Sequence, residues 1–203
     1  MAIYDVKKVH RRLYAPPQGR FDVVDVPPMR YLAVDGHGDP NTTPAYPKAV
    51  RALYAVAYTL RSAQKAAGRP FVVSPLEGLW RATDPAAFVR REKSAWNWTM
   101  LIALPEWVSD AEVTAARRAA RTRTDVDVAG VDVLAHDEGR CVQTLHVGSY
   151  DDEGPVLDRL HREFMPEHGL TFHGDHHEIY LGDPRRTPAE RLRTVLRQPV
   201  RAG

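Results

Sequence analysis

One order of predicted elements occurs twice along the chain and limits the folds open to it. Alternating apolar residues, turn residues and helical periodicity predict strand, strand, helix and strand over residues 21–104 and again over residues 131–182. The repeat aligns Glu77 with Glu178, each in its third strand. A helix on one side of a small sheet leaves the other face uncovered. Two such units could pair so that their uncovered, glutamate-bearing faces form a cleft, in an α+β fold.

Two helices have clear sequence signals. Cap residues followed by Pro44 begin a helix that we expect to run to about residue 66, with one buried stripe of apolar residues. Ser109 and Glu112 form a capping-box pair at the start of a second helix, over residues 109–121. This second helix is expected to connect the two repeats.

The remaining elements follow from shorter patterns. The first twenty residues are loop-like, a strand is expected over residues 71–80, and a helical turn over residues 83–91. Residues 176–181 alternate with period two, as a strand does. A threonine–proline pair at residues 187–188 then has the signature of a helix start.

Composition and charge bound the class of protein. With 203 residues, 43% of them hydrophobic, the chain can bury a real core as one domain over residues 1–203. A formal net charge of +2 gives no reason to expect a nucleic-acid partner. The single cysteine, Cys141, fits a reducing compartment, and no apolar run is long enough to span a membrane. A cytoplasmic protein is expected.

Several segments, spread in order over nearly the whole chain, carry a resemblance. They are residues 35–41, 52–60, 75–80, 96–100, 146–153 and 176–200. Together they resemble the GyrI-like small-molecule-binding family, in its branch of stand-alone proteins. Several matches in the same order are more specific than any single motif.

The resemblance implies a fold and an activity. It implies a tandem repeat of two strand-helix-strand-strand modules with pseudo-twofold symmetry, antiparallel sheets with helices on one side, and a ligand cleft between the modules. The modules would cover residues 21–104 and 131–200. Some stand-alone members resemble cyclopropanoid cyclopropyl hydrolases, which detoxify DNA-alkylating natural products by opening a cyclopropane ring with water. Some relatives are the effector-binding domains of transcription activators, which also carry a DNA-binding segment. Only loop-like residues precede the first module here, so a transcription regulator is not expected.

The candidate site residues combine acidic and aromatic character. Glu178 and Tyr180 share one strand face and are the candidate catalytic pair, with Glu178 as general base and Tyr180 polarising a ligand carbonyl. The candidate ligand-binding residues are Glu77, Trp80, Trp96, Trp98, Tyr54, Tyr58 and Tyr150. Glu77 fits a surface position on an edge strand equally well, and at least one tryptophan is expected only to pack.

Metal and cofactor chemistry are not expected. His176 and His177 stand beside Glu178, but neighbouring strand residues point to opposite faces, so the three side chains cannot chelate one ion without distortion. The expected partner is a small aromatic or hydrophobic ligand. Three functions stay open: a hydrolase, a protein that binds and sequesters drugs without turnover, and a protein that interacts with DNA gyrase. The oligomeric state is left open.

Overall fold

The computed structural model describes residues 3–83 and 92–203, which form an α+β protein with antiparallel sheets. The predicted fold class is confirmed in this respect. The chain divides into two compact units. Unit 1 comprises Met1–Val9, Met29–Ser74 and Gly78–His136, and unit 2 comprises His10–Pro28, Pro75–Glu77 and Asp137–Gly203.

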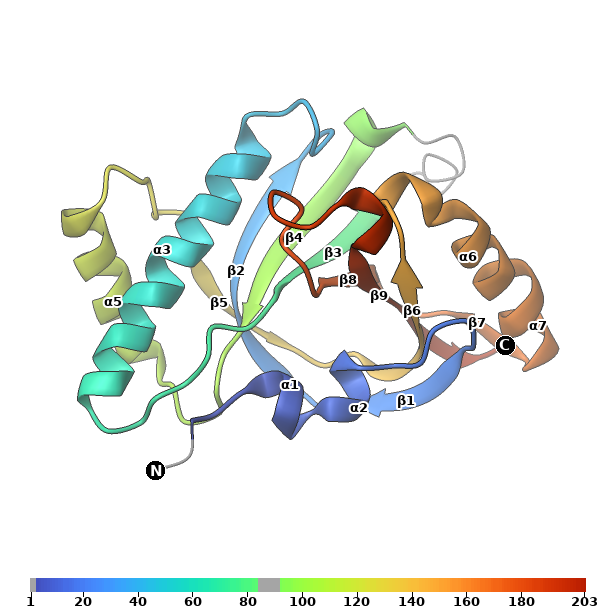
Figure 1. Ribbon diagram of the computed structural model, residues 1–203, viewed down its shortest axis with the longest axis horizontal. Coiled ribbons are helices and arrows are strands. Elements are labelled where there is room, and N and C mark those ends of the chain that lie inside the picture. Colours follow the sequence, from blue (N-terminus) through green and yellow to red (C-terminus); the bar gives the residue numbers. More distant parts are fainter. Residues whose placement is uncertain (1–2, 84–91) are drawn as a thin grey trace. The chain divides into compact units, whose positions relative to one another are not determined.

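Unit 1 is built on a sheet with the strand order β3, β4, β2, β5. Its elements are α1 (Val6–Val9), β2 (Met29–His37), α3 (Ala45–Ala66), β3 (Leu76–Ala82), β4 (Trp96–Ala103), α5 (Asp110–Arg123) and β5 (Asp132–His136), with a 3-10 turn at Lys93–Ala95. Figure 1 shows α3 beside the sheet and α5 next to α3, in agreement with the contacts between these elements. Leu53, Val56 and Leu60 of α3 are fully buried and form the centre of this core.

Unit 2 has the strand order β1, β6, β9, β8, and β7 also pairs with β9. Its elements are α2 (Arg11–Tyr14), β1 (Asp22–Val26), β6 (Gly139–Val147), α6 (Gly154–Arg159), α7 (Met165–Glu167), β7 (Leu170–Phe172), β8 (His176–Tyr180) and β9 (Arg193–Ala202). A π-helical segment, Leu160–Phe164, joins α6 to α7, and 3-10 turns lie at Tyr150–Asp152 and Ala189–Arg191. Leu160 and Met165 pack against Val142 and Val200, so this helical run covers one face of the sheet.

The two units do not coincide with the two repeats in the sequence. Strand β1 pairs with β6 of unit 2, with Asp22 opposite Gln143, although β1 lies just before β2 in the chain. Strand β5 pairs with β2 of unit 1, with Met29 opposite His136. Strand β1 thus precedes β2 of unit 1 in the chain but completes the sheet of unit 2. Strand β5 precedes β6 of unit 2 but completes the sheet of unit 1. The predicted module bounds and pseudo-twofold symmetry stay predictions.

The two strongest helix predictions are confirmed. The helix expected from Pro44 to about residue 66 is α3. In α5 the Ser109 hydroxyl accepts from the backbone N–H of Glu112, whose side chain accepts from the backbone N–H of Ser109, which is the predicted capping box. No described helix is long and apolar enough to cross a membrane.

Three local predictions differ from the structure. The helix predicted to begin at residues 187–188 is wrong: only a 3-10 turn forms there, and the chain continues as β9. The first twenty residues are not only loop, because α1 and α2 form within them. The strand predicted over residues 71–80 begins only at Leu76. The turn predicted over residues 83–91 lies almost entirely outside the described residues.

Candidate functional site

Strand β8 brings the two predicted catalytic residues together. The Tyr180 hydroxyl donates to Oε2 of Glu178 at 2.8 Å. The Glu178 side chain is only 15% exposed, so its carboxylate is largely shielded from solvent. The ring of Tyr150, a predicted ligand-binding residue, meets the Tyr180 ring edge to face with centroids 5.5 Å apart. The period-two pattern thus predicted this neighbourhood of Glu178 and Tyr180 correctly, and its catalytic role stays a prediction.

The phenol of Tyr150 is protonated and can donate a hydrogen bond. Burial, and then the carboxylates of Glu153 and Glu178, raise the pKa of the Tyr150 phenol to about 12. The phenol therefore keeps its proton at any pH in the physiological range. Tyr150 and Tyr180 are two phenols beside one carboxylate, an arrangement that can hold a polar ligand group next to a base.

Glu178 lies on the helix-covered face of unit 2's sheet. Side chains of directly opposed residues in antiparallel strands share a face. Glu178 is opposite Leu196, Leu196 is opposite Thr144, and Thr144 shares its face with Val142 two residues away. Val142 packs against Leu160 of the helical run. The expectation that the glutamate faces away from the helix is therefore wrong.

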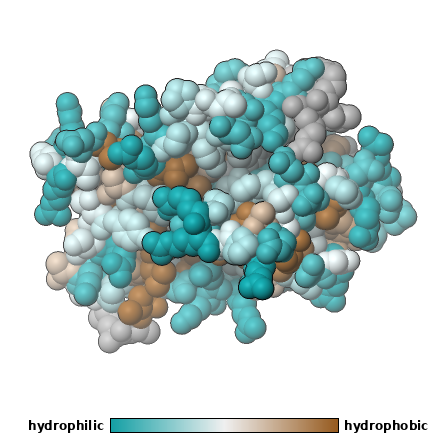
Figure 2. Space-filling model, turned by 45° about the horizontal axis from the view of Figure 1, so that its top comes forward, coloured by the Kyte–Doolittle hydropathy of each residue, from teal (hydrophilic) through white to brown (hydrophobic). Residues whose placement is uncertain are grey.

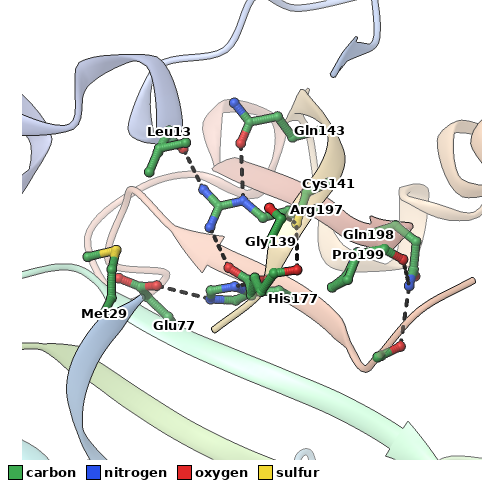
Figure 3. A network of polar contacts seen from close by, with 12 residues as sticks. Leu13, Met29, Glu77, Gly139, Cys141, Gln143, His177, Arg197, Gln198 and Pro199 are labelled. Carbon is green, nitrogen blue, oxygen red and sulfur yellow. Dashed lines mark hydrogen bonds and ion pairs between the residues drawn. The ribbon is translucent and has the colours of Figure 1, made fainter. Parts of the chain in front are cut away.

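The opposite face of the same sheet carries a buried chain of charges (Figure 3). The imidazole of His177 bonds Glu138 through Nδ1 at 2.9 Å and Glu77 through Nε2 at 3.0 Å. Arg197 donates to the second oxygen of Glu138 at 3.0 Å. The side chains of all four residues are at most 1% exposed. We call these four side chains the buried ion network.

Segment α2 closes the buried ion network. The Tyr14 hydroxyl donates to Oε1 of Glu77 at 2.7 Å, and Arg197 donates to the backbone carbonyl of Leu13 at 2.8 Å. Gln143 links Arg197 to the carbonyl of Arg12, with distances of 3.1 and 2.8 Å. Because buried charges require such partners, the network fixes α2 onto the sheet of unit 2.

The network shifts the pKa values of its members. Burial lowers the pKa of His177, but the carboxylates of Glu138 and Glu77 raise it more, to about 9. Burial raises the pKa of Glu138, but the charges of His177 and Arg197 lower it more, to well below its usual range. At neutral pH the network therefore contains an imidazolium and a guanidinium among its carboxylates.

Glu77 was expected either to bind the ligand or to lie on the surface of an edge strand. The alternative that Glu77 is a surface residue is wrong, because it is 0% exposed. Both of its carboxylate oxygens have partners, Tyr14 on Oε1 and His177 on Oε2. A ligand that used Glu77 would have to replace one of these bonds.

The predicted tryptophans form an aromatic cluster in unit 1. Trp80 and Trp96 meet with centroids 5.7 Å apart, and Tyr46 of α3 contacts both Trp80 and Trp98. Trp98 is 0% exposed and its indole N–H donates to the Gly38 carbonyl at 3.2 Å. Trp98 is thus a core residue, as expected for at least one tryptophan, and Trp96 is partly exposed.

Tyr54 and Tyr58 make the contact that their spacing predicts. Their rings stack with centroids 6.0 Å apart, and Tyr58 is exposed. An open cavity of about 480 Å³ lies beside α3, lined by residues that include Val34, Ala49 and Trp98. Trp98 is the member of the predicted set that lines it.

The protein surface and the grouping of metal-ligating side chains complete the description of the site. Among the described residues on the face shown in Figure 2, hydrophobic side chains lie in separate patches among hydrophilic ones. Over residues 3–83 and 92–203, no three His, Cys, Asp or Glu side chains are grouped to hold a metal ion.

Sequence reasoning gives no functional or structural role to two members of the buried ion network, Glu138 and Arg197. Their signal is weak, because a charged residue in a strand or turn is usually exposed. The position of His177 on the apolar face of β8 was the available hint, since a buried histidine needs polar partners on both ring nitrogens.

Comparisons with known proteins agree with the fold. The family model of the GyrI-like small molecule binding domain matches residues 20–201. An uncharacterized conserved protein from Listeria innocua has 37% identity and a TM-score of 0.90, with 98% of this chain and 100% of that chain covered. A hydrolase encoded by lin2189 from Listeria innocua has 35% identity and a TM-score of 0.87, with the same coverage.

A more distant structure shares the fold alone. The EcmrR C-terminal domain has 9% identity and a TM-score of 0.60, with 91% of this chain and 98% of that chain covered. A comparison with curated proteins gave no match. The family match covers nearly the whole chain and the two relatives from Listeria exceed 30% identity over their full length. The chain therefore belongs to the GyrI-like small-molecule-binding family.

Proposed function

We propose that the protein is a hydrolase that opens the strained cyclopropane ring of a planar aromatic electrophile with water. The observation that carries the proposal is the shielded Glu178 carboxylate, held at 2.8 Å by the Tyr180 hydroxyl. The relative encoded by lin2189, described as a hydrolase and 35% identical over its whole length, supports an enzymatic role. The free, buried Cys141 fits the reducing, cytoplasmic setting that belongs to this proposal.

Glu178 would act as the general base. It takes a proton from water as the water oxygen bonds to the ring carbon, and the broken carbon–carbon bond passes its electron pair to the conjugated carbonyl. A phenol donor, Tyr180 or Tyr150, would stabilise the negative charge that grows on the carbonyl oxygen. Ring strain already lowers the barrier, so one base and one donor suffice.

Aromatic side chains would hold the planar part of the ligand. Trp96, Tyr54 and Tyr58 stay the proposed stacking residues, since flat faces bind flat ligands well. Trp80, Trp98 and Glu77 are weaker candidates, because all three are buried. Quenching of tryptophan fluorescence by ligand, compared between the wild type and Trp96→Phe, would test the partly exposed tryptophan of this set.

The decisive experiment measures turnover. A synthetic spirocyclopropyl cyclohexadienone becomes a phenol on ring opening, so its loss can be followed by ultraviolet absorption. We expect Glu178→Gln to lower kcat by about 100-fold or more with little change in KM, as for loss of a general base. The matched control is Glu190→Gln, an exposed glutamate of the same unit, which should keep full activity.

Binding without turnover is the second candidate. The family description, a small molecule binding domain, favours it. Saturable binding of the dienone with no product after long incubation would replace the hydrolase by a sequestering protein. Equal kcat in wild type and Glu178→Gln would instead remove Glu178 from the chemistry.

A further inference from the structure

A histidine lies beside Glu178 on the same face of β8. Nε2 of His176 is 3.6 Å from Oε1 of Glu178, whereas the Tyr180 hydroxyl donates to Oε2. The His176 side chain is 13% exposed, nearly as shielded as Glu178. The carboxylate therefore has a phenol on one oxygen and an imidazole close to the other.

Both ring nitrogens of His176, Nδ1 and Nε2, are buried without a hydrogen-bond partner within residues 3–83 and 92–203. Leaving a buried polar atom unsatisfied costs about 1–3 kcal/mol. Buried polar atoms without a partner are few in native proteins, and a role in binding or catalysis is one reason that they are kept.

A second histidine borders this place. His161 lies in the π-helical segment Leu160–Phe164, and such segments occur frequently at functional sites. Its Nε2 is buried with no hydrogen-bond partner in the described part of the chain. Burial, and then His176, lower the pKa of His161 to about 4, so His161 is neutral and does not compete as a cation for Glu178.

We propose that His176 is a further catalytic residue, which orients the attacking water together with Glu178. This inference rests on the proposed hydrolase function. A separation of 3.6 Å is too long for a direct hydrogen bond. It allows a single water oxygen to lie within hydrogen-bond distance of both Nε2 and Oε1. The tautomer with its proton on Nδ1 leaves Nε2 free to accept.

The proposed step adds water across the strained carbon–carbon bond. The water donates one hydrogen to Oε1 of Glu178 and the other to Nε2 of His176, which turns an oxygen lone pair toward the ring carbon. As the carbon–oxygen bond forms, the first proton passes to Glu178 and the strained carbon–carbon bond breaks. Its electron pair moves into the conjugated carbonyl, whose oxygen takes a proton from solvent through the phenol beside it. Glu178 then returns its proton to solvent.

The test compares His176→Ala, His176→Gln and His173→Gln, the last an exposed histidine just before β8. With the spirocyclopropyl dienone as substrate, we expect His176→Ala to lower kcat at least 10-fold and KM less than 3-fold. Added imidazole should restore much of this loss, because it can occupy the space of the removed ring. His176→Gln, which keeps an acceptor near the position of Nε2, should lie between wild type and His176→Ala.

Each outcome decides between the two proposals. Wild-type kcat in His176→Ala, with an inactive Glu178→Gln, would overturn the role of His176 and leave the hydrolase intact. A loss of activity in His176→Ala that imidazole does not restore, with circular dichroism unchanged, would also overturn it. Absence of turnover in the wild type would refute both proposals together. His173→Gln should behave as the wild type in every assay.

Discussion

The buried ion network predicts how the stability of the protein depends on pH. His177 is 0% exposed and is held between Glu77 and Glu138, at 3.0 and 2.9 Å. Its pKa is about 9 in the folded protein and 6.5 in an unfolded chain. The folded state therefore keeps a proton that the unfolded state loses between these two pH values.

The sign and size of the effect follow from this difference. The stabilisation by His177 is complete below pH 6.5, decreases as the pH rises toward 9, and is lost above that value. A tenfold difference in proton affinity corresponds to about 1.4 kcal/mol, so the whole effect is on the order of 3 kcal/mol. Glu138, whose pKa is lowered, contributes stability that is lost instead as the pH falls below its ordinary value of 4.5.

Urea unfolding from pH 6 to pH 9.5 measures this dependence. The free energy of unfolding should fall with rising pH in the wild type, and the slope should be much smaller in His177→Gln. The exposed control His173→Gln should keep the wild-type slope. A nuclear magnetic resonance titration of the wild type gives a second readout that needs no variant. A midpoint near 6.5 for the His177 ring, or a flat stability from pH 6 to 9.5, would refute the argument.

Two further substitutions test packing and hydrogen bonding. Tyr14→Phe removes the donor to a buried carboxylate at 2.7 Å and should lower the free energy of unfolding by about 1.5–3 kcal/mol in urea titrations. Tyr58→Phe, at an exposed tyrosine, is its control, and equal values for the two variants would contradict the network. Gly36→Ala would place its Cβ 2.0 Å from a ring atom of Trp98, and we expect a loss of about 1–3 kcal/mol. Gly154→Ala, whose Cβ meets nothing within 4 Å, should leave the thermal midpoint nearly unchanged, and a similar result for Gly36→Ala would show that the core can yield.

Local chemistry explains what the sequence predicted. The capping box of Ser109 and Glu112 lies within a few residues, so its signal needs no knowledge of the rest of the fold. The contact of Glu178 with Tyr180 is likewise local, because period-two alternation places them on one face of β8. The approach of His161 to that face depends on tertiary packing and has no sequence signal.

Tertiary burial explains where prediction was wrong. The cap signature at residues 187–188 is genuine helix-start chemistry, but only a single 3-10 turn follows it. The following residues form β9, which pairs with both β6 and β8 and is buried along most of its length.

Strand β1 completes the sheet of unit 2 and β5 completes the sheet of unit 1, and this pairing also determines the order in which the protein can fold. Unit 2 joins residues that are far apart in the chain: Arg197 donates to the carbonyl of Leu13, 184 residues away. Residues 10–28, although synthesised early, have no strand partner until β6 has been made, and the buried ion network has no Arg197 until β9 follows. Contacts between distant residues slow folding. Unit 2 therefore folds late in synthesis, and until then its first strand has an unpaired edge that is open to aggregation.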